Sequence, residues 1–285
     1  MDRILVATDF SERSDRALRR ATLIAKRVEA ALILVHVVDG DRPARLVASD
    51  EAAAWSVLEE SAKTLRDHDG ILAESLVRVD DVDAGVLAAA EETRAQLVVL
   101  GPHRSRLRDV FVGTTVERVV RRTRLPMLVA VQTPSAPYGR TLLALDLDDA
   151  SKSAARAAVE LGVFEHTDVI AFHSFAMMGK GMMQRAMIPK EDIDEHVDTE
   201  RALAVRRLRA LVDEVGLRPS GQRVAEHQGA PVGSILETAA REDAQLIVMG
   251  TNQRKGFERL LIGSITEDVI RHTKRDVLIV PIDPD

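Results

Sequence analysis

The sequence has 285 residues, of which 46% are hydrophobic and 29% charged, so it has enough apolar material to fold and is not a disordered chain. Its formal net charge of −6 and aromatic content of 3% argue against nucleic-acid binding, because phosphate backbones require clustered positive charge and unpaired bases stack on aromatic rings. It contains no cysteine, which excludes disulfides, thiolate zinc sites and a cysteine nucleophile.

The N-terminal segment, MDRILVATDF, reads directly as a strand. It lacks the basic region and long apolar run of a signal peptide. No apolar stretch approaches the roughly 18 residues of a membrane span. These features predict a cytoplasmic protein without a membrane span.

Short apolar runs alternate with helical patterns along the first half. The predicted strands are ILVA (4–7), LILVHV (32–37), LVVL (97–100) and MLVAV (127–131). Helical spacing occupies residues 11–28, with Ser11 as the expected N-cap, and residues 50–67. Strands that are apolar on both faces and separated by helices indicate a parallel sheet covered on two sides. The pattern therefore predicts a doubly wound α/β fold of about five strands, whose ligands sit beyond the carboxyl ends of the strands.

The second half repeats the first. Asp9 aligns with Asp146 and His36 with His173, each 137 residues later, while Gly101 aligns with Gly250, 149 residues later. The offset rises from 137 to 149, so the second copy is twelve residues longer between the second strand and the glycine loop. Within that loop the offset rises once more, because Gly113 aligns with Gly263, 150 residues later. The repeat predicts two tandem five-stranded domains.

The boundaries follow from the connector QTPSAPYG (132–139), whose prolines and glycine are typical of a short linker. We expect domain 1 at residues 1–133 and domain 2 at residues 139–285. The twelve extra residues fall in a methionine-rich insert at about 175–191, which holds five of the eight methionines. Flexible thioethers suit either an adaptable binding surface or the filling of a core gap. The insert is accordingly interpreted either as a mobile lid or binding surface, or as core packing.

Polar residues and glycines recur at the predicted strand ends. Asp9 and Asp146 follow the first strand of each copy, where a carboxylate accepts hydrogen bonds from a sugar hydroxyl or base amine, or instead supports the next helix. Gly113-Thr114 and Gly263-Ser264 open a helix whose free N–H groups suit an anion, although a hydroxyl there is equally a helix cap.

This set of features resembles the universal stress protein family in its tandem form, over essentially the whole chain. In that family strand one ends in an Asp, and strand four enters a loop of the form G-x-x-G-x9-G-[ST], which cradles the phosphates of ATP in nucleotide-binding members. The segment GTNQRKGFERLLIGSITEDVIRHTKRDVLIV is similar to the C-terminal part of the family. The resemblance implies a stress-tolerance binding and signalling protein rather than an enzyme of rapid turnover.

Both copies depart from the family pattern. In domain 2 the loop has the right length, but Gln253 stands where the second glycine is expected. In domain 1 the loop is one residue shorter, and Arg104 stands near that position. Domain 2 keeps the family's G-x-P as 229–231, whereas domain 1 has Asp-Asp-Val at 80–82. On loop length, domain 2 is the expected nucleotide site and domain 1 the weaker one.

The resemblance implies two sets of nucleotide-binding residues. In domain 2 they are Asp146, Ser174, Gly250, Gln253, Gly263 and Ser264. In domain 1 they are Asp9, Val37, Gly101, Arg104, Gly113 and Thr114. The expected cofactor is ATP or a related adenine nucleotide, or another small ligand, with Mg²⁺ as an accompanying ion. No catalytic residue and no resident metal site is expected, because the histidines show no ligand spacing.

The resemblance also implies partners. Single-domain relatives pair through their last strand, so the two domains are expected to associate through the edges at 127–131 and 277–281, and a homodimer is a further expectation. Two other functions remain open. The first is a nucleotide-free scaffold that binds a protein or an apolar ligand through the methionine-rich insert. The second is slow ATP hydrolysis, for which the sequence supplies no recognisable general base.

Overall fold

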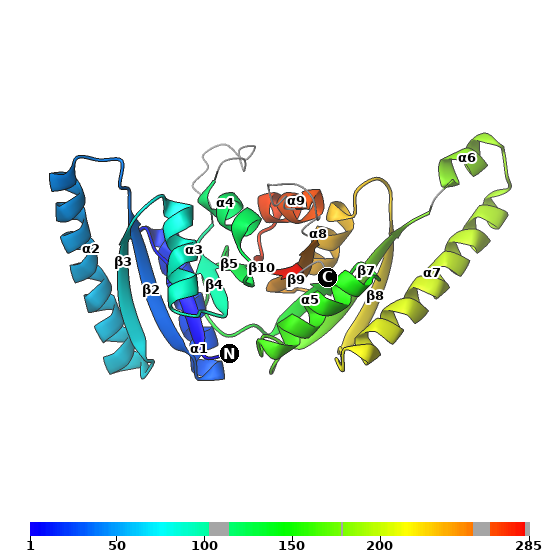
Figure 1. The fold of residues 1–285 in the computed structure, drawn as a ribbon. Coiled ribbons are helices and arrows are strands. Elements are labelled where there is room, and N and C mark those ends of the chain that lie inside the picture. Colours follow the sequence, from blue (N-terminus) through cyan, green and yellow to red (C-terminus); the bar gives the residue numbers. More distant parts are fainter. Residues whose placement is uncertain (103–113, 178, 253–262, 283–285) are drawn as a thin grey trace.

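In a computed structural model of the protein, one ten-stranded sheet runs through the whole chain (Figure 1). The structure describes residues 1–102, 114–177, 179–252 and 263–282. The strand order is β3-β2-β1-β4-β5-β10-β9-β6-β7-β8, so the first five strands and the last five form two adjoining blocks. We refer to β1–β5 with their helices as the first half and to β6–β10 with theirs as the second half. The α/β class with a mostly parallel sheet is the one predicted.

The elements of the two halves follow the same alternation of strand and helix. The first half contains β1 (Arg3–Ala7), α1 (Glu12–Val28), β2 (Ala31–Val38), α2 (Ala44–Thr64), β3 (Ala73–Val79), α3 (Val82–Glu92), β4 (Leu97–Leu100), α4 (Thr115–Arg122) and β5 (Met127–Val129). The second half contains β6 (Arg140–Ala144), α5 (Asp149–Glu160), β7 (Asp168–Ala176), α6 (Lys180–Arg185), α7 (Lys190–Glu214), β8 (Gly221–His227), α8 (Val232–Arg241), β9 (Leu246–Asn252), α9 (Ser264–His272) and β10 (Asp276–Ile282).

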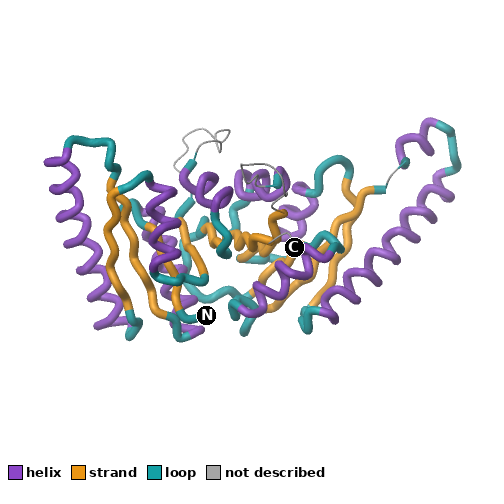
Figure 2. The backbone as a smooth tube through the Cα atoms, viewed as in Figure 1, coloured by secondary structure: helices purple, strands orange, loops and turns teal. Residues whose placement is uncertain are grey.

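Both faces of the sheet are covered by helices, as Figure 2 shows. Successive side chains of a strand point to opposite faces, so Val6 and Leu34 pack toward α1 and α2, while Leu5 and Val35 pack toward α3 and α4. The second half repeats this division, with α5 and α7 on the first face and α8 and α9 on the second. The apolar runs of the strands are therefore buried on both sides, which explains why they do not alternate with polar residues.

Strand registers reproduce the offsets of the sequence repeat. Val6 pairs with Leu34 in the first half, and Leu143 pairs with Ala171 in the second, a shift of 137 in both strands. Ile4 pairs with Leu97, and Thr141 pairs with Leu246, which reproduces the shift to 149. Positions related by these offsets therefore occupy the same place in the two halves.

The two halves meet where β5 and β10 pair antiparallel. Leu128 lies opposite Leu278, flanked by the pairs Met127–Ile279 and Val129–Val277. Because Leu128 and Leu278 are themselves equivalent in the repeat, an approximate twofold axis passes through this pair. All the other strand pairings within the described residues are parallel.

A buried polar cluster joins the halves beside this strand pair. Asp276 Oδ1 accepts hydrogen bonds from the backbone N–H groups of Val131 and Gln132, both at 2.8 Å. Its Oδ2 accepts from Arg20 Nε at 2.9 Å and from the Tyr138 hydroxyl at 2.7 Å. Both carboxylate oxygens thus have two donors, which a buried charge requires.

Two elements differ from the sequence-based expectations, and a third segment takes a form that the sequence did not specify. Helix α2 begins at Ala44, just after Pro43, rather than near residue 50, and ends in a wider π-helical turn at Leu65–Asp69. Strand β9 continues past Gly250 to Asn252, because β10 extends to Ile282 and pairs with it. The methionine-rich segment forms the end of β7 and the short helix α6, which packs against α7 at the outer end of the molecule (Figure 1).

Among the described helices, none combines the length and the apolar character needed to cross a bilayer.

Candidate functional site

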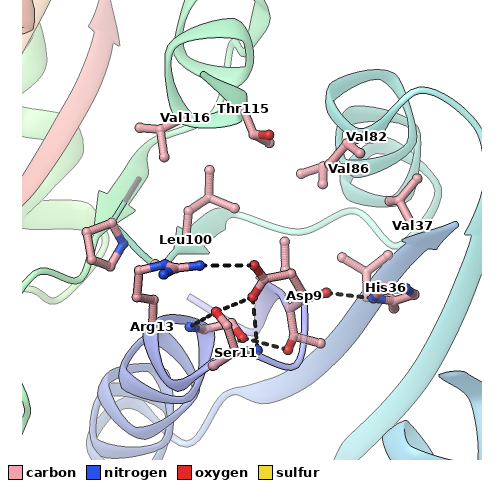
Figure 3. Close-up of a pocket in the computed structure, with 16 residues that line it drawn as sticks. Asp9, Ser11, Arg13, His36, Val37, Val82, Val86, Leu100, Thr115 and Val116 are labelled. Carbon is pink, nitrogen blue, oxygen red and sulfur yellow. Dashed lines mark hydrogen bonds and ion pairs between the residues drawn. The ribbon is translucent and has the colours of Figure 1, made fainter. Parts of the chain in front are cut away.

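A cavity lies at the carboxyl ends of β1, β2 and β4, on the side of α3 and α4 (Figure 3). Its volume is about 230 Å³, and its walls are mainly aliphatic. The lining residues that matter below are Asp9, Arg13, Val35, Val37, Val86 and Thr115. This is the place where ligands bind in open parallel sheets.

A turn after β1 places Asp9 at the floor of the cavity. Ser11 caps α1 by accepting a hydrogen bond from the Ser14 N–H, so the predicted N-cap is confirmed. The hydroxyl of Ser11 donates to Asp9 Oδ1, and its backbone N–H donates to the same oxygen at 3.1 Å. The Asp9 side chain nevertheless remains 64% exposed, so the other carboxylate oxygen can accept a hydrogen bond from a ligand.

The electrostatics of this turn favour an ionised Asp9. Partial burial is the largest influence and raises the pKa of Asp9, but hydrogen bonds from Ser11 and the positive charge of Arg13 outweigh it. The pKa of Asp9 therefore lies below its ordinary value of 3.8. The guanidinium of Arg13 is 3.6 Å from Asp9 Oδ2, a separation too long for a hydrogen bond. Arg13 thus places its positive charge beside Asp9 in the lining of the cavity.

The opposite side of the cavity is formed by two helix starts. Val82 and Val86 of α3 provide apolar surface, and Thr115 and Val116 open α4 (Figure 3). Thr114 is buried and caps α4, since its hydroxyl accepts from the Glu117 N–H at 3.1 Å. The N–H groups of a first helical turn have no partner inside the helix, and they favour an anion at this end.

Gly101 explains how β4 and α1 approach each other beside the cavity. A Cβ atom on Gly101 would lie 2.6 Å from the carbonyl oxygen of Arg13, which belongs to the backbone of α1. Only glycine therefore permits this separation. In the second half a Cβ on Gly250 would instead meet the side chains of Ile282 and Ala154, at 2.8 and 2.9 Å.

The equivalent cavity of the second half is much smaller, about 40 Å³. Asp146, Ser174 and Gly250, three of the predicted nucleotide-binding residues, line it. Its volume is reduced by larger side chains at equivalent positions, which we pair as first half and second half: Val35 and Phe172, Val86 and Ile235, Thr115 and Ile265. Phe172 is only 1% exposed, so its ring occupies space that Val35 leaves open.

Charge also differs between the two cavities. The position of Arg13 is taken by Ala150 in the second half. The turn after β6 contains Asp146 and Asp148, and Asp149 begins α5. Asp148 uses its carboxylate to cap α5 through the Ser151 N–H at 2.8 Å. Negative charge without the matching arginine is unfavourable for a phosphate.

The predicted site residues divide into three groups. Those that line a cavity are Asp9, Val37, Gly101, Asp146, Ser174 and Gly250. Those at a helix start beside a cavity are Thr114, Gly263 and Ser264. Arg104, Gly113 and Gln253 lie outside the described residues.

Sequence reasoning missed Arg13, Val35 and Thr115. Arg13 stands four residues after Asp9 in the first turn of α1, a spacing that places the two side chains together. Val35 lies two residues before Val37 on β2, so both side chains point to the same face of the sheet. The alternation of side chains along a strand could therefore have identified Val35 from the sequence.

The strand-two histidines have matching roles in the two halves. His36 Nδ1 lies 2.8 Å from the Thr8 carbonyl oxygen, and His173 Nδ1 lies 2.8 Å from that of Leu145. A carbonyl only accepts, so Nδ1 carries the proton in both rings. Within the described part of the chain, no group of three or more acidic or histidine side chains is arranged to hold a metal ion.

Comparison with known proteins gives a consistent result. The sequence model of the universal stress protein family matches residues 1–131 and 137–281. A universal stress protein of Mycolicibacterium smegmatis is 27% identical over 97% of this chain and 96% of its own length. The crystal structure of a universal stress protein from Archaeoglobus fulgidus has a TM-score of 0.72, with 19% identity and 98% of both chains covered, a likeness of fold. A universal stress protein solved in complex with cAMP covers 47% of this chain and 98% of its own, with 25% identity and a TM-score of 0.39.

Proposed function

We propose that this chain, which belongs to the universal stress protein family, is a stress-tolerance binding and signalling protein that holds an adenine nucleotide in the cavity of its first half. The observation that carries the proposal is the 230 Å³ cavity, in which aliphatic walls meet Asp9, Arg13 and the start of α4. Apolar surface with a few convergent polar groups is the usual composition of a small-molecule site.

The cavity suits the parts of a nucleotide in turn. The aliphatic side chains of Val35, Val37 and Val86 provide a dry surface for a planar base. The carboxylate of Asp9 accepts hydrogen bonds from ribose hydroxyls, because its lowered pKa keeps it ionised. Arg13 and the first turn of α4 would meet the phosphates at the mouth. A volume of 230 Å³ is below the roughly 300–1,000 Å³ of sites that enclose a whole drug-sized ligand, so the phosphates project outward.

We place the nucleotide in the first half, although loop length alone favours the second. Phe172, Ile235 and Ile265 reduce the second cavity to about 40 Å³, which is smaller than a purine base requires. The second half also lacks the arginine that accompanies Asp9. We further propose that the functional units are domains 1–133 and 139–285, and that only the first is a nucleotide site.

The decisive test is calorimetric titration of the purified protein with ATP and Mg²⁺. We expect one site per chain in the wild type. Val35→Phe places in the first cavity the residue found in the second, and should abolish binding without loss of folding, because the cavity has room for the ring. Phe172→Val, the reverse change in the other half, is the control and should leave this first site unchanged. Unaltered affinity in Val35→Phe would exclude the first cavity.

A second candidate is a nucleotide-free scaffold that uses the methionine-rich segment. Met182 is 69% exposed and Met187 is 89% exposed, and flexible thioethers adapt to varied apolar partners. The described residues that line the second cavity include none from 177–189, so this segment is better placed to contact another molecule than to cover that site. Absence of a signal at millimolar nucleotide, in the titration above, would favour the scaffold.

A further inference from the structure

A further cavity, distinct from the two described above, opens on the other face of the first half, between β1, β2, α1 and α2. Its volume is about 140 Å³. The residues that line it are Val6, Thr8, Phe10, Asp15, Leu18, Leu34, Val57, Leu58 and Ser61. We call it the α1–α2 cavity. Six of these side chains are apolar, and the three polar ones are a carboxylate and two hydroxyls.

The α1–α2 cavity is separate from the proposed nucleotide site. Val6 and Leu34 point to the face covered by α1 and α2, whereas Ala7 and Val35, their neighbours in sequence, line the nucleotide cavity on the opposite face. Thr8 is the one described residue that lines both. The sheet itself thus divides the two spaces.

Phe10 forms an unusual wall of the α1–α2 cavity. Its φ is 59°, a left-handed conformation that is strongly disfavoured for a bulky side chain. The structure supports it by a hydrogen bond from the Phe10 N–H to Thr8 Oγ1 at 3.0 Å and by stacking on His36, with ring centroids 4.5 Å apart. Even so, Phe10 is 41% exposed. A strained and exposed aromatic ring beside a cavity is a feature that packing alone does not explain.

Polar groups give the cavity a direction. The carboxylate of Asp15, in the first turn of α1, has no hydrogen-bond or ion-pair partner among the residues that the structure describes. Val57 lies at the rim, since it lines the cavity and is also 44% exposed. A ligand would enter past Val57 and find an apolar interior, with the exposed carboxylate of Asp15 and the hydroxyls of Thr8 and Ser61 as acceptors.

The second half does not repeat these residues. Leu145 replaces Thr8 and is 5% exposed within the core, and Leu147 replaces Phe10 and packs against the same core. Lys152 stands at the position of Asp15 and is paired with Asp149 and Glu214. The polar groups and the exposed ring therefore belong to the first half alone.

We propose that the α1–α2 cavity binds a small single-ring aromatic molecule that carries one N–H or O–H donor. The volume matches that of an engineered apolar cavity of about 150 Å³ that holds benzene. The ring would stack or pack against Phe10 and the aliphatic side chains, and the donor would face Asp15.

Phenol and toluene are suitable probes, since they have nearly the same shape and only phenol carries a hydrogen-bond donor. Binding is followed by saturation-transfer NMR and by the fluorescence of Trp55, the one tryptophan of the chain, which lies on α2. We expect saturable millimolar binding of phenol to the wild type, and roughly tenfold weaker binding of toluene, because a hydrogen bond to a charged group strengthens binding by about that factor. In Asp15→Ala, which removes the acceptor, phenol should lose its advantage over toluene.

Substitutions at the rim locate the site. Val57→Phe should lower phenol affinity at least tenfold, by filling the entrance. Val205→Phe on α7 is the matched control at a similarly exposed helical valine, and should leave phenol affinity unchanged. Val35→Phe should also leave it unchanged, which distinguishes this site from the nucleotide cavity. Unfolding midpoints confirm that each variant is folded. Failure of phenol to saturate, or equal affinity in Val57→Phe and wild type, would overturn the proposal.

Discussion

Arg20 Nε lies 2.9 Å from Asp276 Oδ2, although the two residues are 256 positions apart in the sequence. Both side chains are almost completely buried, with exposed fractions of 3% and 0%. The guanidinium also stacks over the Tyr138 ring at 3.9 Å and donates to the Ala136 carbonyl at 3.0 Å. One ion pair thus connects α1, the connector between the halves, and β10.

Removing one partner of this pair should destabilise the whole protein. Arg20→Met leaves the carboxylate of Asp276 buried without its countercharge, and the expected loss in free energy of unfolding is about 3–5 kcal/mol. Arg201→Met is the matched control, because Arg201 forms only an exposed pair with Asp198 on α7, worth less than about 1 kcal/mol. Urea denaturation of both variants measures the difference. A loss in Arg20→Met no greater than in the control would contradict this role.

The ionisation of the Tyr138 phenol at alkaline pH tests the stability of the same buried cluster. Burial is the main cause that raises the pKa of Tyr138 well above its ordinary 10.0, and the adjacent Asp276 carboxylate adds to it. The folded state therefore favours the protonated phenol, so stability is complete below pH 10 and falls as the pH rises toward the folded-state pKa. Because the chain has a single tyrosine, tyrosinate absorbance should appear only together with unfolding. Tyr138→Phe should reduce the loss of stability above pH 10, and a free titration of Tyr138 in the folded protein would argue against its burial.

The two strand-four glycines should differ in their tolerance of alanine. A Cβ at residue 101 would lie 2.6 Å from the backbone oxygen of Arg13, whereas at residue 250 it would meet the side chains of Ile282 and Ala154, at 2.8 and 2.9 Å. We expect Gly101→Ala to cost about 1–3 kcal/mol and to weaken ATP binding, because α1 and Arg13 must shift. Gly250→Ala should cost less and leave ATP binding unchanged. Thermal unfolding and ATP titration of the two variants measure which substitution costs more stability and affinity. A larger cost in Gly250→Ala would refute the backbone contact at residue 101.

Arg13 should act on the phosphates rather than on the nucleoside. Arg13→Ala is expected to weaken ATP binding about tenfold, as the loss of a charge-assisted hydrogen bond implies, while adenosine affinity stays the same. Arg19→Ala is the control, because Arg19 is an exposed residue of the same helix and removes the same charge. Equal effects of the two variants on ATP would indicate general electrostatic attraction instead of direct contact.

Enlarging the cavity of the second half should create a second nucleotide site. Phe172→Val combined with Ile265→Thr exchanges two of the three larger side chains for those of the first-half cavity, at a cost of about 2–4 kcal/mol for the truncated core. Calorimetry should then show the ATP stoichiometry rising from one to two per chain. If the stoichiometry remains one in a folded double variant, volume alone does not account for the difference between the halves, and the missing arginine becomes the main cause.

The fold could be predicted from the sequence because its signals are local and repeated. The apolar runs mark strands, and the offsets of 137 and 149 reappear in the strand registers. Cavity volume could not be predicted in this way. The difference between Val35 and Phe172 is visible in an alignment of the halves, but its effect depends on which side chains face the same space. The pairing of Arg20 with Asp276 was likewise beyond reach, since neither residue has an equivalent partner in the repeat.

The contact between β5 and β10 has a consequence for how the two copies have diverged. In an assembly of two identical chains every substitution appears twice, so a residue near the twofold axis must be compatible with the same residue of the other chain. Here the equivalents of Arg20 and Asp276 are Ala157 and Pro126, and the buried pair is formed only once. Covalent linkage keeps both copies together at any dilution. One copy was therefore free to acquire an arginine and the other an aspartate, and one ligand cavity could be filled while the other stayed open.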